Sequence, residues 1–260
     1  MLGLVLLSGL SLQLYFVARI GLMAVLAPQS TAFQRSEAWR LLQAGHGLHW
    51  RQDWVDDGQI ASSLKRAVIA SEDAGFVDHN GVEWDALEQA WEKNLRAEAQ
   101  AAKRNAQLEQ RNAQLEKRAA APKATASGQA PGKPKVEPKL VGGSTISQQL
   151  AKNLLLSGER SAARKAQEFV LTLTLEALLS KRRILEIYLN NVEWGEGVFG
   201  AQAAAQHYFH VDAARLPAAA AARLAVMLPA PKRFEKTPGS AYVSGRAATI
   251  IGRMGAVALP

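Results

Sequence analysis

An adjacent pair of carboxylates, Glu72 and Asp73, stands in a mainly apolar stretch and is the first candidate for chemistry. On a helix, Glu72, Phe76 and His79 would share one face, so a carboxylate, an aromatic ring and an imidazole would point together just before a glycine turn at Gly81. Such a pair is unusual on an apolar helix unless it lines a cleft. The alternative is a solvated helix end, with its acids placed for the helix dipole.

A second group of polar residues begins at Ser144, directly after the glycine pair Gly142-Gly143. On the helix expected there, Thr145, Gln148, Gln149 and Lys152 fall on one side. They would present a hydroxyl, two carboxamides and an ammonium beside a helix N-terminus, which suits a sugar and a diphosphate. A plain polar outer face is the other interpretation, and the residues alone favour neither.

A third group contains Arg160, Arg164, Lys165 and Glu168. Because Arg164 and Glu168 are one helical turn apart, a surface salt bridge is the simplest interpretation. Together with Lys152, the group could instead form an anion cradle with a second carboxylate at its edge. Two carboxylates that flank a cleft are typical of glycosidic chemistry, in which one handles the proton and the other the developing positive charge.

Composition excludes several other classes of site. The chain of 260 residues has no cysteine, which excludes a disulfide scaffold and a Cys-ligated metal. The histidines His79, His207 and His210 lack partners at metal-ligand spacing, so no metal site is predicted. The net charge is +8, but residues 96–139 contain ten Lys and Arg against four Glu and so carry +6 of it. The rest is close to neutral, and we expect no nucleic-acid partner.

The N-terminus predicts a membrane anchor. No charged side chain occurs from Met1 to Ala18, and a helix from Leu2 to Ala27 would be roughly 39 Å long, more than the hydrocarbon core of about 30 Å. Pro28 ends this segment. A cleaved signal peptide is the alternative, but its basic leading region is missing. The flanking charges are too few to fix the orientation.

Helices are expected for most of the remaining chain. Residues 50–95 have helical periodicity, interrupted by a turn at 78–81. A hydroxyl after the glycine pair predicts a helix start near residue 144, and Ser161 predicts the cap of a helix that continues to about Leu179. Further helices are expected at 181–190, 201–206 and 213–227. No convincing strand alternation is found, so the fold class is mainly α.

Residues 96–139 are a basic, low-complexity segment. A seven-residue duplication, 104–110 and 111–117, suggests a heptad, but one strong apolar position per heptad over two heptads disfavours a coiled coil. We expect a solvated helix followed by a disordered Pro/Ala/Lys tether at 121–139. One hypothesis is that this segment is attracted to anionic lipid headgroups.

Together these segments resemble the peptidoglycan glycosyltransferases of family 51, and most closely their monofunctional biosynthetic members in Gram-negative bacteria. The resemblance extends from about Trp54 to Met254 and is interrupted by 96–139. It rests on five ordered blocks, which are Ala67–Asp73 with Phe76, His79 and Gly81; Gly142–Asn153; Arg164-Lys165-x-x-Glu168; Lys181–Asn190; and Trp194–Gly200 with Ala203–Phe209.

The resemblance implies a lysozyme-like helical domain, anchored in the inner membrane by one N-terminal helix and facing the periplasm. It implies polymerisation of lipid II into glycan strands, with inversion and release of undecaprenyl diphosphate. By the same resemblance Glu72 is the general base, Lys152 and Arg160 neutralise the diphosphate, and Glu168 orients those cations or assists the donor ring. Other matching positions are assigned to substrate binding: Asp73, Phe76, His79, Ser144, Thr145, Gln148, Gln149, Arg164, Lys165 and Asn190.

The same resemblance gives the expected organisation, cofactors and partners. The anchor is 1–28, a juxtamembrane segment is 29–50, and the glycosyltransferase domain is 51–260 with its insertion at 96–139. No obligatory cofactor is implied, although Mg²⁺ or Mn²⁺ could assist the diphosphate. Lipid II and the growing glycan strand are the substrates, and penicillin-binding transpeptidases and division or elongation proteins are expected partners. The alternatives are a lytic, lysozyme-like enzyme and a membrane-anchored scaffold.

Overall fold

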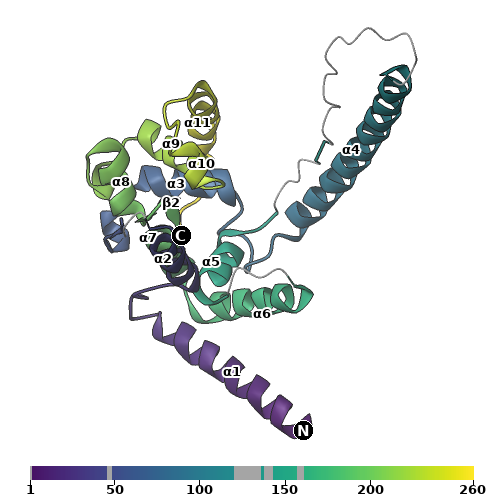
Figure 1. Cartoon of the computed structure of the whole chain (residues 1–260). Helices are drawn as coiled ribbons and strands as arrows, with labels where there is room; N and C mark the ends of the chain where they lie inside the picture. Colours follow the sequence, from purple (N-terminus) through teal and green to yellow (C-terminus); the bar gives the residue numbers. More distant parts are fainter. Residues whose placement is uncertain (1, 46–48, 120–135, 138–142, 157–160) are drawn as a thin grey trace. The chain divides into compact units, whose positions relative to one another are not determined.

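The computed structural model describes residues 2–45, 49–119, 136–137, 143–156 and 161–260, and divides the chain into two compact units. One unit combines Met1–Val82 with Ser144–Pro260, and the other is Glu83–Gly143. Helices dominate both units (Figure 1), which confirms the predicted mainly α class.

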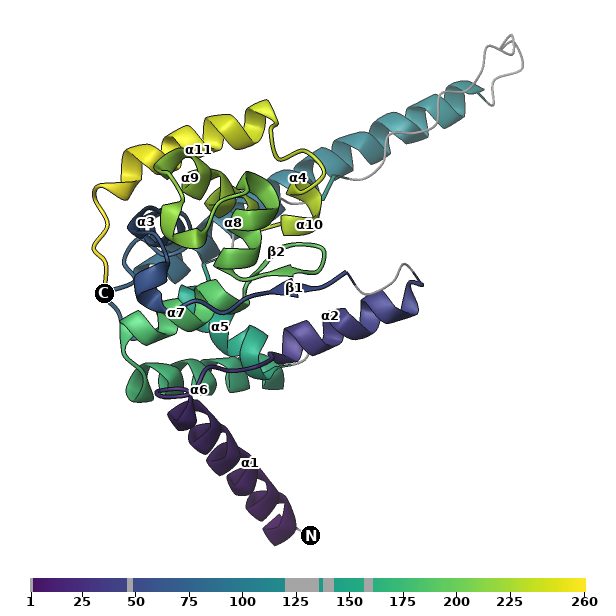
Figure 2. The same ribbon diagram turned by 90° about the vertical axis from the view of Figure 1, so that its left-hand side faces the viewer.

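Three helices of the first unit, α3 (Ser62–Glu72), α9 (Ala218–Met227) and α11 (Ala241–Met254), pack against one another (Figure 2). Ala221, Ala222 and Ala225 of α9 are fully buried, and their small side chains let neighbouring helices approach closely. The chain leaves this group at the C-terminus of α3, where Glu72 is the last helical residue.

A second group is built around α5 (Ile146–Leu155), which packs against α2 (Ala32–Gln43), α6 (Ala162–Leu178) and α7 (Lys181–Asn191). The predicted caps are confirmed: Thr145 caps α5 and Ser161 caps α6, each accepting a hydrogen bond from a backbone N–H three residues later. Ser180 caps α7 in the same way. The helices predicted over these residues are therefore present, within one or two residues at the described ends.

A small sheet joins the segment before α3 to the segment after α7. Strands β1 (Arg51–Gln52), β2 (Glu193–Gly195) and β3 (Val198–Phe199) have the order β1-β3-β2, with β1 parallel and β2 antiparallel to β3. The expectation of a strand-free body, and of a helix from residue 50, was wrong here. Strands of two or three residues are too short to show alternation, and β2 and β3 are buried throughout.

Shorter elements complete this unit. They are α8 (Ala201–Phe209), α10 (Pro231–Phe234) and the 3₁₀ turns Asp57–Gln59 and Ala213–Arg215. The predicted Ala-rich helix at 213–227 is thus divided into a 3₁₀ turn and α9. The division falls at Pro217, which precedes the first residue of α9 and has no N–H to donate.

The N-terminal helix α1 (Leu2–Leu22) is long and apolar enough to cross a membrane, with a mean hydropathy of 1.6 over Gly3–Leu22. It is held to the rest of its unit by side chains of α6 and α7. Gln13 and Gln167 exchange hydrogen bonds of 2.7 and 3.2 Å. Arg183 of α7 donates to the carbonyls of Met23 and Leu26, in the segment just after α1, at 2.7 and 2.9 Å. The prediction of one apolar N-terminal helix is confirmed.

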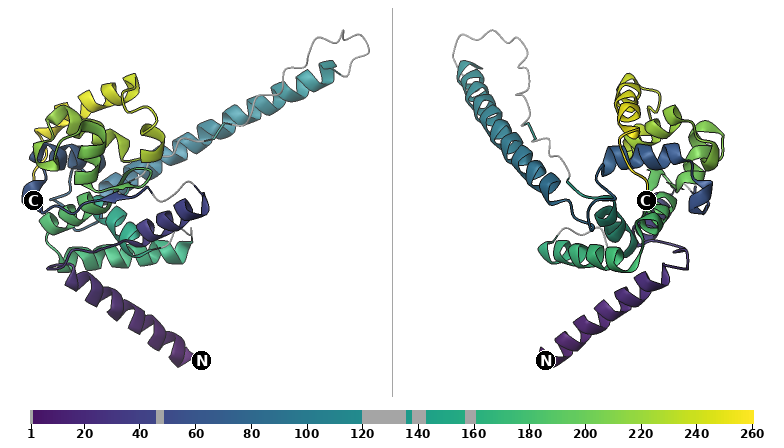
Figure 3. Two further views of the ribbon diagram at one scale, coloured as in Figure 1. Left: turned by 60° about the vertical axis from the view of Figure 1, so that its left-hand side comes forward. Right: turned by 180° about the vertical axis from the view of Figure 1, so that it is seen from behind.

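The second unit contains α4 (Trp84–Ala119), which is a single uninterrupted helix (Figure 3). The sequence instead suggested a break in character at residue 96. Of the expected tether at 121–139, only Val136 and Glu137 lie within the described residues. The backbone of Val136 pairs with the Asn105 amide through hydrogen bonds of 2.7 and 3.0 Å, so this point of the chain returns alongside α4.

Candidate active site

Glu72, at the C-terminus of α3, meets the side chain of Gln149 from α5. The amide Nε2 of Gln149 donates to Oε2 of Glu72 at 3.0 Å. Burial raises the pKa of Glu72 by desolvating its charged form, and the negative charge of Asp73 adds to this, whereas hydrogen bonds from Gln149 and Ser71 oppose it. A buried carboxylate with a raised pKa, held in place by side-chain hydrogen bonds, has the properties of a general base.

Tyr188 of α7 fixes the orientation of Gln149. Its hydroxyl donates to Oε1 of Gln149 at 2.9 Å, which leaves the amide nitrogen of Gln149 directed at Glu72. The Tyr188 ring is buried, and burial raises the pKa of its hydroxyl, so this group remains a donor. No role for Tyr188 is predicted from the sequence. The one indication in the sequence is that Tyr188 stands between two apolar residues, Ile187 and Leu189. A tyrosine buried among apolar residues needs a hydrogen-bond partner for its hydroxyl.

Asp73, the residue after α3, anchors the turn that follows this helix. Its Oδ2 accepts from the backbone N–H of Ile146 at 2.9 Å, and its Oδ1 pairs with Nε2 of His79 at 2.8 Å. Because Nδ1 of His79 accepts from the N–H of Gly81 at 3.1 Å, the ring hydrogen is placed on Nε2. The predicted common face of Glu72, Phe76 and His79 is wrong, because the helix ends at Glu72.

The N-terminus of α5 is fixed by Thr145 and Gln148. Their side chains form a reciprocal capping box, and the Thr145 hydroxyl also donates to the carbonyl of Gly81 at 2.6 Å. Gly81 has φ +87°, and a Cβ there would lie 2.8 Å from Cγ2 of Thr172, so glycine is required. Thr145 and Gln148 are both buried, and their hydrogen bonds are used in holding α5.

Three other predicted substrate-binding residues differ in exposure. Phe76 is fully buried, with the Lys181 ammonium 4.6 Å from its ring centroid. Asn190 is also fully buried, and its amide bonds both backbone groups of Val55 at 2.9 Å. Ser144 is exposed, just before the cap of α5. The structure therefore places Phe76 and Asn190 in the scaffold and leaves Ser144 accessible.

A cationic group lies at the other end of α5. Lys152 follows Gln149 by three residues, and its side chain reaches solvent. Its pKa is lowered, chiefly by partial desolvation; Glu168 acts in the opposite direction, and the positive charges of Arg164 and Lys165 add to the lowering. These shifts place Lys152 within the electrostatic field of the first turns of α6.

Glu168 organises the cations of α6. It is buried, forms a short ion pair with Lys165 and lies 3.6 Å from Nη1 of Arg164. Nε of Arg164 is buried and has no hydrogen-bond partner among the described residues. An anion beside Lys152 would therefore meet the positive charges of Arg164 and Lys165 as well. Arg160, predicted for this group, lies outside the described residues.

Comparisons with known proteins decide the family. The family model described as Transglycosylase matches residues 41–110 and 130–255. The chain belongs to this family. A biosynthetic peptidoglycan transglycosylase of Burkholderia pseudomallei (strain K96243) is 48% identical over 251 residues, which are 96% of this chain and 83% of that protein. One from Paraburkholderia phytofirmans (strain DSM 17436 / LMG 22146 / PsJN) is 45% identical over 252 residues, 96% of this chain and 88% of that protein.

Membership confirms the resemblance found in the sequence and makes the chain a glycosyltransferase. Within this transglycosylase, α3, α5, α6 and α7 bring together residues that lie far apart in the sequence, such as Glu72 and Gln149, which are 77 positions apart. Glu72, Gln149 and Tyr188 form one continuous set of contacts, and Lys152, Arg164, Lys165 and Glu168 form the adjoining charged set.

Proposed function

We propose that this transglycosylase polymerises lipid II into linear glycan strands for the cell wall, with inversion at the anomeric carbon and release of undecaprenyl diphosphate. The observation that carries the proposal is the contact between Glu72 and Gln149, because it holds a carboxylate of raised pKa against a residue that is one helical turn from Lys152 on α5. The relatives named above are biosynthetic peptidoglycan transglycosylases, which supports peptidoglycan as the product.

Glu72 acts on the acceptor. Its carboxylate takes the proton of the acceptor sugar's 4-hydroxyl while that oxygen bonds to the anomeric carbon of the donor. The raised pKa of Glu72 makes the carboxylate a stronger base than an ordinary, solvated glutamate. Gln149 holds the carboxylate in one orientation through Nε2, so less rearrangement is needed in the transition state.

The cations act on the donor. As the bond from the anomeric carbon to the diphosphate oxygen breaks, negative charge collects on the diphosphate, and Lys152 with Arg160 stabilises it. Arg164 and Lys165 add positive charge from α6, and buried Glu168 holds both in place. Ser144 completes the accessible polar groups beside Gln149, whereas Asp73, His79, Thr145, Gln148, Phe76 and Asn190 act by holding the helices in position.

The proposed reaction has no obligatory cofactor. The carboxylate at this end of the site, Glu168, is already paired with Lys165 and Arg164, so it offers a poor ligand set for a divalent cation. We propose that Mg²⁺ or Mn²⁺, where it assists, is bound by the diphosphate oxygens.

The apolar helix α1 suits a substrate that is itself anchored in lipid. Confinement of enzyme and substrate to one membrane raises their effective concentration. We extend the proposal to a single-pass protein of the inner membrane with its catalytic domain in the periplasm, where penicillin-binding transpeptidases and division or elongation proteins are the expected partners.

The proposal is tested with the full-length protein in detergent and labelled lipid II. Gel separation should show a ladder of glycan strands, and extraction should recover undecaprenyl diphosphate in equal amount to the bonds formed. Lys152→Ala should reduce the rate on the order of a hundredfold, because the variant lacks one of the positive charges that stabilise the departing diphosphate. Intact lipid II with the wild-type protein would contradict the proposal, and shortening of preformed strands would instead indicate a lytic enzyme.

A further inference from the structure

A small pocket of about 260 Å³ lies where α1 ends and the chain turns toward α2. Arg19, Gln29 and Ser30 supply a guanidinium, a carboxamide and a hydroxyl to its lining. The other lining residues are all apolar: Leu22, Met23, Leu26, Ala27 and Pro28. None of these residues has a part in the proposed reaction. A lining that combines polar and apolar groups in this way suits a ligand that is itself amphiphilic.

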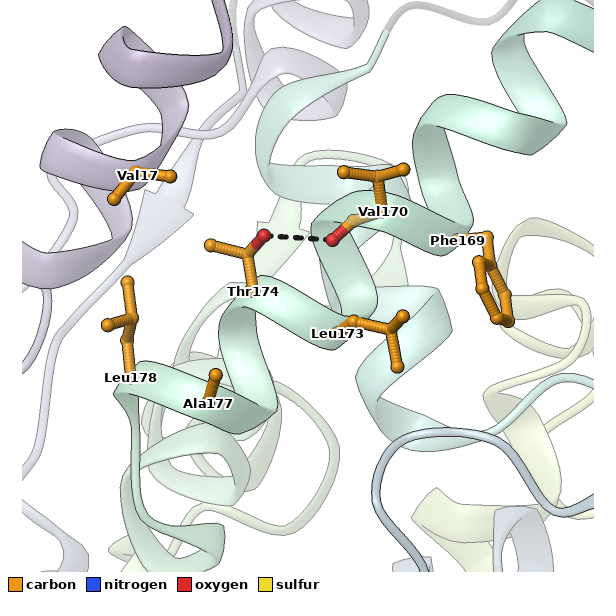
Figure 4. A pocket seen from close by; sticks show the side chains of 7 residues that line it. All are labelled: Val17, Phe169, Val170, Leu173, Thr174, Ala177 and Leu178. Atoms are coloured by element: carbon orange, nitrogen blue, oxygen red, sulfur yellow. Dashed lines mark hydrogen bonds between the residues drawn. The ribbon is translucent and has the colours of Figure 1, made fainter.

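The pocket is at the edge of the surface that would lie in a membrane. Val17 of α1 and Leu178 of α6 line one apolar groove (Figure 4), and each is more than 40% exposed, as lipid-facing side chains would be. The apolar span of α1 ends at Leu22, and Arg19 is in its last turn. An arginine in this position extends its charged group into the headgroup region. The pocket therefore lies at the boundary between hydrocarbon and water.

The turn that forms the pocket is held from the side of α7 by Arg183. The Arg183 guanidinium donates to the carbonyls of Met23 and Leu26 at 2.7 and 2.9 Å. It also pairs with Glu186 at 2.8 Å, so its charge is balanced within α7. These contacts fix the backbone between α1 and Pro28, and the pocket is therefore shaped before any ligand binds.

Positive charge gathers at the pocket without a carboxylate. In the described part of the chain Arg19 has a neutral partner alone, because its Nη1 donates to the Tyr15 hydroxyl at 3.1 Å. Nη1 of Arg35 donates to the hydroxyl and carbonyl oxygens of Ser30, at 3.1 and 3.4 Å. No Asp or Glu occurs in the sequence before Glu37. A guanidinium has five N–H donors, so Arg19 retains donors for an oxyanion.

An oxyanion attached to an apolar body fits these features. A glycerophospholipid has its phosphate at headgroup level, where it would meet Arg19, and its acyl chains beside the apolar residues of the pocket. The absence of a carboxylate from the lining distinguishes between headgroups. The ammonium of a zwitterionic lipid would find no opposite charge there, whereas an uncharged headgroup needs none and can form hydrogen bonds with Gln29 and Ser30.

We propose that the pocket at the end of α1 binds one acidic phospholipid, with its phosphate on Arg19 and its uncharged headgroup toward Gln29 and Ser30. The lipid belongs to the leaflet on the side of the catalytic domain. Its binding stabilises the turn that Arg183 joins to α7, and so holds the domain at a fixed depth at the membrane surface. This role uses none of the residues of the proposed reaction and does not depend on it.

The test measures lipid retention by the full-length protein in detergent, using native mass spectrometry. The protein is mixed with equal amounts of phosphatidylglycerol and phosphatidylcholine that carry the same acyl chains. Arg19→Gln removes the guanidinium, and Gln29→Glu adds a carboxylate at an exposed position of the pocket. Arg246→Gln, at an exposed position on α11, is the matched control, because all three substitutions lower the net charge by one. Circular dichroism confirms that each variant is folded.

We expect the wild-type protein to retain one phosphatidylglycerol and to prefer it over phosphatidylcholine by roughly fivefold, the effect of one basic side chain near an anionic membrane surface. Arg19→Gln and Gln29→Glu should abolish this preference, and Arg246→Gln should keep it. Equal retention of the two lipids by the wild type, or an unchanged preference in either pocket variant, would overturn the proposal. Displacement of the lipid by an equimolar amount of inorganic phosphate would also overturn it, because the pocket would then bind a free anion equally well.

Discussion

The amide nitrogen of Gln149 lies 3.0 Å from Oε2 of Glu72, and this contact joins the C-terminus of α3 to the first turn of α5. It stabilises the charged form of a carboxylate whose pKa burial raises. The balance of the two effects sets the pH at which Glu72 can accept a proton, so it governs the acid side of the reaction's pH profile.

Removal of the Gln149 amide should shift that profile. In Gln149→Leu the hydrogen bond that lowers the pKa of Glu72 is lost while burial remains, so the pKa rises further. Activity requires the ionised carboxylate, and therefore the acid limb of kcat/KM should move to higher pH. The measurement is polymerisation rate against pH for both proteins. An unchanged limb would show that Gln149 does not act on Glu72.

Tyr188→Phe should also move the acid limb of kcat/KM to higher pH. Tyr188 acts through Gln149 and does not itself contact substrate in the proposed reaction. Loss of the hydroxyl leaves Oε1 of Gln149 without its donor, so the amide is free to rotate and Nε2 is no longer held against Glu72. Tyr208→Phe is the control, because its hydroxyl also bonds a protein oxygen, the Trp194 carbonyl at 2.9 Å, but on a different set of elements. If both variants lower kcat equally and leave the limb in place, Tyr188 serves only packing.

Glu193 should make stability depend on pH in the opposite sense to most carboxylates. Burial raises its pKa to about 7 despite the Lys232 ammonium at 3.4 Å. Between the ordinary value of 4.5 and about 7, the folded protein holds a proton that the unfolded chain has lost, so the contribution of Glu193 falls as pH rises. At about 1.4 kcal/mol per pKa unit, this amounts to roughly 3 kcal/mol.

Glu193→Gln should remove this dependence. The variant should be more stable than the wild type at pH 8 and similar to it at pH 5, by thermal unfolding in detergent. Glu196→Gln is the control: Arg40 lowers the pKa of this exposed carboxylate, so its removal should not stabilise the protein at pH 8. A Glu193→Gln variant that is less stable than the wild type at pH 8 would refute the assignment.

The sequence predicted the helices of the site better than the roles of its residues. Ser161 and Thr145 indicated where two helices begin, because helix capping depends only on residues close together in the sequence. The end of α3 was missed because it depends on Asp73, whose partners Ile146 and His79 come together only in the fold. Tyr188 was missed for the same reason, since the hydroxyl has meaning only beside Gln149.

Burial also separated residues that the motifs had grouped. Thr145, Gln148 and Gln149 are almost consecutive, and periodicity alone placed them on one polar side. In the fold the first two form a capping box and only Gln149 reaches Glu72. Amphipathic patterns cannot distinguish a polar side chain that holds a helix end from one that faces substrate, because both avoid the apolar core.

The most direct test of the account is a comparison of Glu72→Gln with the wild type, using labelled lipid II and gel separation of the glycan strands. Glutamine keeps the size and a hydrogen-bonding group but cannot take a proton at neutral pH. We predict a ladder from the wild type and a loss of at least about a hundredfold in the variant, the usual contribution of a general base. Comparable ladders from both proteins would contradict the central claim that Glu72 accepts the proton of the 4-hydroxyl.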